Sequence, residues 1–151
     1  MTAEFTDPTP EDAQRAFHDH LIDKANAARL AYGLYIDAEA IERMLGDPDV
    51  VRYPTVLEFD AAPLQPHEFG YARPRGFHPS DGFVLSIHPA FRGQPENVPL
   101  VVAYHIPTIN YASVIDAAGA ELFGATLLGL EPDVYYHALC ELADSIGAVA
   151  V

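Results

Sequence analysis

The sequence has one cysteine, one lysine and no tryptophan. Cys140 alone cannot form a disulfide within the chain, and it cannot build a cysteine-based zinc finger. Lys24 is the only lysine, and eight basic side chains face 22 acidic ones, which gives a net charge of −14. Binding to a nucleic-acid backbone or an anionic membrane needs clustered Lys and Arg, so this balance argues against both kinds of partner.

Long hydrophobic runs are also missing. The most apolar stretch, 109–130, is interrupted by Asp116 and Glu121 and falls short of a membrane span. Residues 1–12 are acidic and have neither a basic nor an apolar segment, so we expect no secretory signal and a cytoplasmic location. A length of 151 residues, half of them apolar, is typical of one domain over 1–151 with a single hydrophobic core.

The charge that is present is distributed unevenly. Segments 1–66 and 106–151 carry net charges of −8 and −6, whereas 67–105 holds three arginines and three acids and is neutral. The neutral segment also holds four of the seven histidines. A site that uses histidine or arginine is therefore expected within 67–105.

Four segments have the chemistry of helix starts and stops. The first begins with a capping hydroxyl, then proline, then two acids that suit the positive end of the helix dipole. Glycines follow the apolar stripes of three of the segments, where they predict helix ends. The predicted helices run from Thr9 to Gly33, from Asp37 to Gly46, from Asn110 or Ser113 to Gly129, and from Pro132 onward.

Four strands are predicted between the helical parts, over 56–59, 67–72, 83–88 and 98–106. The last is almost entirely apolar and β-branched or aromatic, which is typical of a central strand covered on both faces. Segment 67–72 lies in proline-rich sequence and is expected at an edge. The element order predicts an α+β fold with two N-terminal helices, a mostly antiparallel sheet of about four strands and two C-terminal helices.

The histidines of the middle segment suggest a metal site. Imidazole and carboxylate groups suit a divalent metal such as zinc, and His67, Glu68 and His78 are the candidate ligands. His67 and His78, together with His88, are also candidate catalytic proton carriers for a hydrolytic or acid–base reaction, and His105 is a further one. No established metal-binding spacing is present, so the alternative is that these are ordinary surface or hydrogen-bonded histidines.

The arginines of the same segment suggest binding of a small anion. Arg73 and Arg75 flank a proline in a glycine-containing run, and arginine can grip a carboxylate or phosphate through two hydrogen bonds. Tyr71 and Tyr104 are the aromatic candidates for contact with the substrate. The alternative is that both arginines pair with acids of the same surface, where they contribute little.

Two classes of function follow. The first is a ligand-binding or enzyme-like domain with a His/Arg site in 67–105 that acts on a small anionic substrate. The second is a non-catalytic acidic module that docks on a basic partner protein or forms a homodimer.

Overall fold

The computed structural model describes residue 7 and residues 9–149, and this part of the chain has the predicted α+β class, with five helices and a three-stranded mixed sheet. Residues 1–6 and 8, which carry most of the expectation about a secretory signal, lie outside the described residues. The helices are α1 (Pro10–Tyr32), α2 (Ala38–Leu45), α3 (Val98–Tyr111), α4 (Ala117–Leu128) and α5 (Pro132–Val149). The strands are β1 (Thr55–Phe59), β2 (Gly70–Pro74) and β3 (Phe83–Ile87).

Helix α1 begins with the cap that its sequence predicts. The Asp12 N–H donates to the Thr9 hydroxyl and the Thr9 N–H donates to the Asp12 carboxylate, both over 3.1 Å. Gly33 ends the helix in a conformation with φ of 103°, which favours glycine. The predicted limits of α2 are confirmed as well, because Asp37 accepts a hydrogen bond from the Ala40 N–H and Gly46 follows the last turn.

We expect Thr9→Ala to lower the free energy of unfolding by about 1 kcal/mol, because it removes the acceptor that satisfies one free N–H at the start of α1. Thr9→Ser keeps that acceptor and should stay close to wild type. Urea unfolding followed by circular dichroism measures both. Equal losses for the two variants would mean that the hydroxyl does not stabilise the helix start.

Segment 98–106, predicted as a central strand, is instead the first part of helix α3. Nine side chains of α3 are buried, and the helix packs against β2 and β3 on one side and α4 on another. A helix that is covered on several sides needs no polar stripe, so its sequence lacks the helical period and resembles a buried strand. Pro107, where the predicted strand stopped, lies inside the helix.

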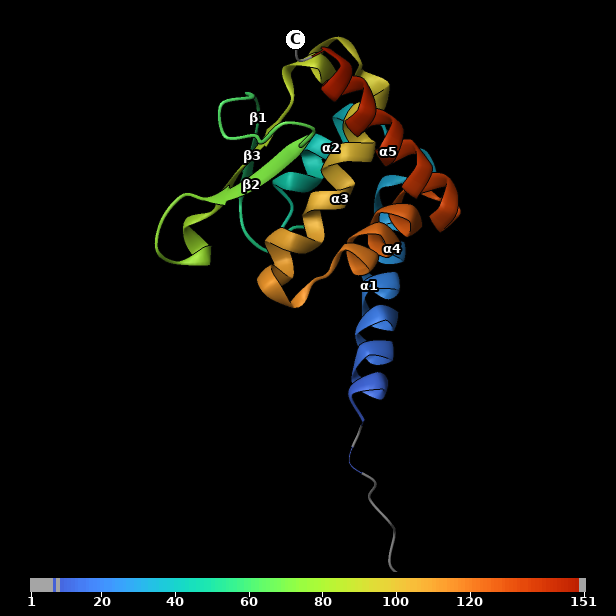
Figure 1. Ribbon diagram of the computed structural model, residues 1–151. Helices are drawn as coiled ribbons and strands as arrows, with labels where there is room; N and C mark the ends of the chain where they lie inside the picture. Colours follow the sequence, from blue (N-terminus) through green and yellow to red (C-terminus); the bar gives the residue numbers. More distant parts are fainter. Residues whose placement is uncertain (1–6, 8, 150–151) are drawn as a thin grey trace, which may run out of the picture.

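The sheet therefore has three strands, and it is mixed rather than mostly antiparallel. Strand β3 lies at its centre, parallel to β1 and antiparallel to β2. The edge position predicted for the 67–72 strand is confirmed for β2. Figure 1 shows α2 and α3 beside the sheet, with α1, α4 and α5 farther from it.

The C-terminal helices were predicted with one error. Helix α4 begins at Ala117, capped by the Asp116 carboxylate, and not at Asn110 or Ser113. Asn110 belongs to α3, and residues 112–114 form a short 3-10 turn. Gly129, with φ of 70°, ends α4, and α5 begins at Pro132 as predicted. None of the described helices combines the length and apolar character that crossing a membrane would require.

Candidate functional site

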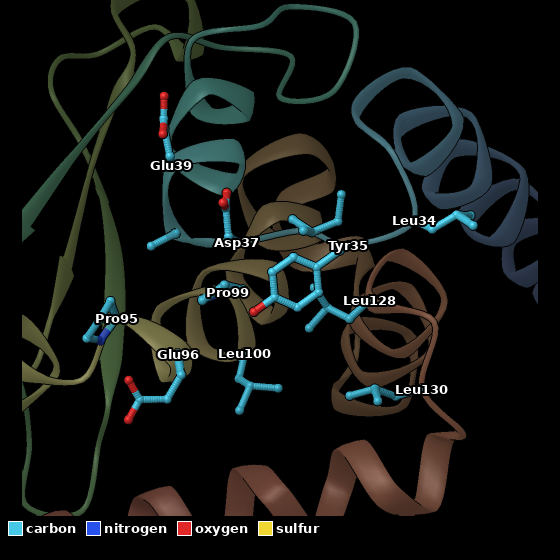
Figure 2. Close-up of a pocket in the computed structure, with 12 residues that line it drawn as sticks. Leu34, Tyr35, Asp37, Glu39, Pro95, Glu96, Pro99, Leu100, Leu128 and Leu130 are labelled. Atoms are coloured by element: carbon cyan, nitrogen blue, oxygen red, sulfur yellow. The ribbon is translucent and has the colours of Figure 1, made fainter.

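A surface cavity of about 480 Å³ lies where the α1–α2 connection meets the starts of α2 and α3 and the end of α4. We call it the Tyr35 cleft (Figure 2). It is lined by Leu34, Tyr35, Ile36, Asp37, Ala38, Glu39, Pro95, Glu96, Pro99, Leu100, Leu128 and Leu130.

The deeper part of the Tyr35 cleft is apolar and fixed in place. Ile36 is buried, and Leu100 and Leu128 pack against the hydrophobic core. The fully buried Tyr135 of α5 donates its hydroxyl to the Leu100 carbonyl oxygen over 2.6 Å. This hydrogen bond ties α5 to the first turn of α3, so the surface that a ligand would meet is preformed.

Two large apolar side chains stand at the mouth of the Tyr35 cleft. Leu34 is 75% exposed and Tyr35 is 81% exposed. Figure 2 shows the Tyr35 ring extending over the cleft, close in view to Leu100 and Leu128. Exposing such side chains to water is unfavourable, and their clustering at a cavity is typical of an interaction site.

Among the residues that the structure describes, the charged side chains that line the Tyr35 cleft are all acidic. They are those of Asp37, Glu39 and Glu96. Asp37 is partly engaged as the cap of α2, through its hydrogen bond from the Ala40 N–H over 2.8 Å. Glu39 and Glu96 have no hydrogen bond or ion pair with any side chain that the structure describes. In Figure 2 the carboxylates of Glu39 and Glu96 point away from the Tyr35 ring.

The candidate metal ligands do not converge. His67 is exposed, with φ of 67°, in the β1–β2 connection, while the Glu68 carboxylate accepts a hydrogen bond from the Gln65 N–H over 3.2 Å. His78 is exposed in the β2–β3 connection, and its N–H donates to the Asp81 carboxylate. Across residue 7 and residues 9–149, no three His, Cys, Asp or Glu side chains are grouped so that they could hold a metal ion.

The remaining candidates also lie apart. His88 accepts a hydrogen bond from the Ala90 N–H on its Nδ1, over 3.1 Å. Position 70 of β2 faces α3, because a Cβ there would meet His105. Successive side chains of a strand point to opposite faces of the sheet, so Tyr71 and Arg73 lie on the face opposite α3. Arg73 forms an ion pair there with Glu58 over 3.4 Å, so its charge is already paired with an acid of the same surface.

Arg75 is exposed in the β2–β3 connection. Tyr104 packs edge-on against Phe69 and His105, and burial raises the pKa of its hydroxyl. None of the nine candidate residues, His105 included, lines the Tyr35 cleft or either of two smaller cavities formed by the described residues.

The Tyr35 cleft was not predicted from the sequence, because its described lining contains neither the histidines nor the arginines on which the predicted sites depend. One signal was present: Leu34 and Tyr35 lie between the glycine that ends α1 and the aspartate that caps α2. Connections between helices are usually polar. Two bulky apolar residues there indicate either a buried loop or a contact surface.

Comparison of the chain with protein-family models, curated proteins and solved structures finds no match in any of the three. The function is therefore inferred from the chemistry of its own residues. In the part of the chain that the structure describes, the residues lining the Tyr35 cleft include no histidine, cysteine, serine or threonine. What they offer is an apolar surface beside uncompensated carboxylates, which suits binding of a group that is both apolar and cationic.

Proposed function

We propose that this chain is a non-catalytic interaction domain whose Tyr35 cleft binds a partner protein through a segment that carries apolar and basic side chains. The observation that supports this most directly is the combination of leucines inside the cleft with carboxylates around it and no basic residue in the lining. Apolar anchors give affinity at protein interfaces, and complementary charge gives specificity and faster association.

The size of the apolar surface favours a protein segment over a small amine. Leu34 and Tyr35 are largely exposed and extend the apolar surface to the mouth of the cavity. A small amine inside the cleft would leave these side chains in water. A peptide segment could cover them, and tyrosine is enriched in such interfaces.

A second copy of the chain fits the cleft less well. In a symmetric dimer the same patch meets itself. The rim would then place Glu39 and Glu96 of both copies in one interface without a basic residue between them, and like charges there disfavour association.

A hydrolytic or acid–base function at His67, His78 and His88 has less support. Two of these histidines are exposed in different connections, and none lines a cavity. A catalytic histidine needs a positioned substrate and a second group within hydrogen-bond reach.

The test is binding of a synthetic helical peptide built from leucine and lysine, with all leucines on one face. We expect measurable binding by fluorescence anisotropy, and no binding of the matching leucine–glutamate peptide. Tyr35→Ala, which changes an exposed side chain, should weaken binding about tenfold. Glu39→Gln combined with Glu96→Gln should weaken it by about tenfold as well.

The control has to separate the cleft from the general acidity of the protein. Glu42→Gln combined with Glu141→Gln removes the same two charges from exposed positions outside the cleft. These variants should bind within about twofold of wild type. Equal weakening by both pairs, or full binding by Tyr35→Ala, would show that the peptide binds the acidic surface at large. Self-association seen by sedimentation, and lost in Tyr35→Ala, would instead favour the homodimer.

A further inference from the structure

Two smaller cavities, each about 360 Å³, share the wall formed by Arg52, Asn110 and Tyr111. We call the pair the Arg52 groove. One cavity is polar and reaches across to α1, while the other is lined mainly by apolar side chains of β3, the end of α3 and the connection before β1. None of these residues belongs to the Tyr35 cleft.

The polar cavity gathers basic groups in a protein of net charge −14. Lys24, the only lysine, and His20 come from α1, whereas Arg52 comes from the connection before β1. Asp49 is the one acidic residue in the lining. Neither Lys24 nor Arg52 forms an ion pair with a residue that the structure describes, so both cations are available to a ligand.

Asn110 fixes the segment that carries Arg52. Its side-chain oxygen accepts a hydrogen bond from the Arg52 N–H over 2.7 Å, and its side-chain nitrogen donates to the Val50 carbonyl over 3.0 Å. Both ends of one amide therefore hold a loop 58 to 60 residues away in sequence. This places the start of the Arg52 side chain at the mouth of the cavity before any ligand arrives, which lowers the entropic cost of binding.

Tyr111 adds a hydroxyl to the same wall. It lies 2.8 Å from the His20 Nε2, and Phe17 packs edge-on against its ring with centroids 5.2 Å apart. The contacts with His20 and Phe17 orient the ring. With the proton of the imidazole on Nε2, His20 donates to the Tyr111 hydroxyl, which keeps its own proton to donate to an anion.

The adjoining cavity is apolar. Tyr53 and Phe83 lie in contact there, with ring centroids 6.0 Å apart, beside Ile109 and the exposed Val114. The Arg52 guanidinium lies 5.8 Å from the centroid of the Tyr53 ring, at the boundary of the two cavities. A ligand with a charged end and an apolar body would match both halves.

We infer that the Arg52 groove binds a small organic anion, with its carboxylate against Lys24, Arg52 and Tyr111 and its aromatic or branched aliphatic part against Tyr53 and Phe83. Arginine and lysine recognise such a group by charge-assisted hydrogen bonds. The anionic ligand expected for the 67–105 segment thus finds its best site elsewhere, and this site is independent of partner binding at the Tyr35 cleft.

The test is titration of the ¹⁵N-labelled chain with 3-phenylpropionate at low ionic strength, followed by NMR chemical shifts. We expect the largest shifts at the amides of Lys24, Arg52 and Tyr111. The neutral 3-phenylpropanol and the ring-free propionate should each bind about tenfold more weakly or not at all, because each lacks one of the two required parts.

Charge variants complete the test. Lys24→Gln and Arg52→Gln should each weaken binding of 3-phenylpropionate about tenfold. Arg15→Gln removes the same charge from an exposed position on the same helix as Lys24, outside the groove, and should have little effect. Tyr35→Ala should also leave this binding intact. The inference is wrong if wild type does not bind 3-phenylpropionate, if the alcohol binds equally well, or if Arg15→Gln and Arg52→Gln behave alike.

Discussion

Gly124→Ala is expected to lower the free energy of unfolding by about 3 kcal/mol, although alanine is the better helix former. Gly124 lies in α4 where Tyr135 of α5 crosses it. A Cβ at 124 would meet the Cε2 and Cζ atoms of the Tyr135 ring at 2.5 Å. Real Cβ atoms do not approach neighbours so closely, so the ring or the helix has to move.

The ring has little freedom to do so. Tyr135 is fully buried, and its hydroxyl is held by the Leu100 carbonyl oxygen. Displacing it costs about 3 kcal/mol in overpacking and about 1 kcal/mol for the hydrogen bond, which the gain in helix propensity of about 1 kcal/mol only partly offsets. Because Leu100 lies in the Tyr35 cleft, the same change should also disturb peptide binding there.

Gly93→Ala is the matched control. A Cβ at 93 would have no heavy atom within 4 Å, and this variant should stay within about 0.5 kcal/mol of wild type in urea unfolding. Tyr135→Leu removes the obstructing ring, so its cost and that of Gly124→Ala should not add when the two are combined. Equal stability of the two alanine variants, or strict additivity with Tyr135→Leu, would contradict the proposed clash.

Local chemistry made the ends of several helices predictable. The hydroxyl of Thr9 and the carboxylate of Asp37 cap helices because a side-chain oxygen bonds to a backbone N–H only three residues away. Gly33 and Gly129 end helices at positive φ, a preference that belongs to the residue itself. Such features depend on a few neighbouring residues and do not require knowledge of the tertiary fold.

Segment 98–106 shows where sequence reasoning failed. Its three valines, Tyr104 and Ile106 favour a strand, but packing between the sheet and α4 overrides that preference. The parallel pairing of β1 with β3 was missed for a related reason, since β2, which lies between them in sequence, is placed on the far side of β3. Neither outcome is encoded by residues that are neighbours in the chain.

The candidate sites depend even more on distant residues. The Tyr35 cleft joins segments near 35, 96 and 129, and the Arg52 groove joins α1 to the end of α3. Lys24 and Arg52 lie in segment 1–66, whose net charge is −8, so the sequence did not indicate a basic site there. The net charge of a segment averages over residues that face different directions. Folding brings Lys24 and Arg52, which are far apart in segment 1–66, to one cavity.

We expect the buried side chain of His105 to make the folded chain less stable in acid. The side chain lies on α3 against Gly70, and its buried Nε2 has no hydrogen-bond partner among the described residues. Its ring also contacts Phe69 and Tyr104, and no charged group contributes to its altered acidity. Burial lowers the pKa of His105 from 6.5 to about 4, because the cation cannot be hydrated there.

The direction of the pH effect follows from this lowered pKa. Well above pH 6.5 the imidazole is neutral in both the folded and the unfolded chain, so it adds no pH dependence. As the pH falls from 6.5 toward 4, His105 becomes protonated in the unfolded chain but stays mostly neutral in the folded chain. At a pH of about 4 this stabilises the unfolded state by about 3 kcal/mol, and at about pH 5.5 by about 1 kcal/mol.

His105→Leu should remove this part of the acid sensitivity. Leucine has no proton to gain, and it also removes the Nε2 that lacks a partner, so stability at neutral pH should change by no more than about 1 kcal/mol. Urea unfolding across the pH range measures the difference in stability between the variant and wild type. The contributions of the carboxylates cancel in this difference because both proteins contain them, including Glu121, whose pKa is raised by burial. His137→Leu removes an exposed histidine instead and should keep the wild-type profile. Parallel profiles for His105→Leu and wild type between neutral and acidic pH would mean that His105 becomes charged inside the folded chain, and that water reaches the space beside Gly70.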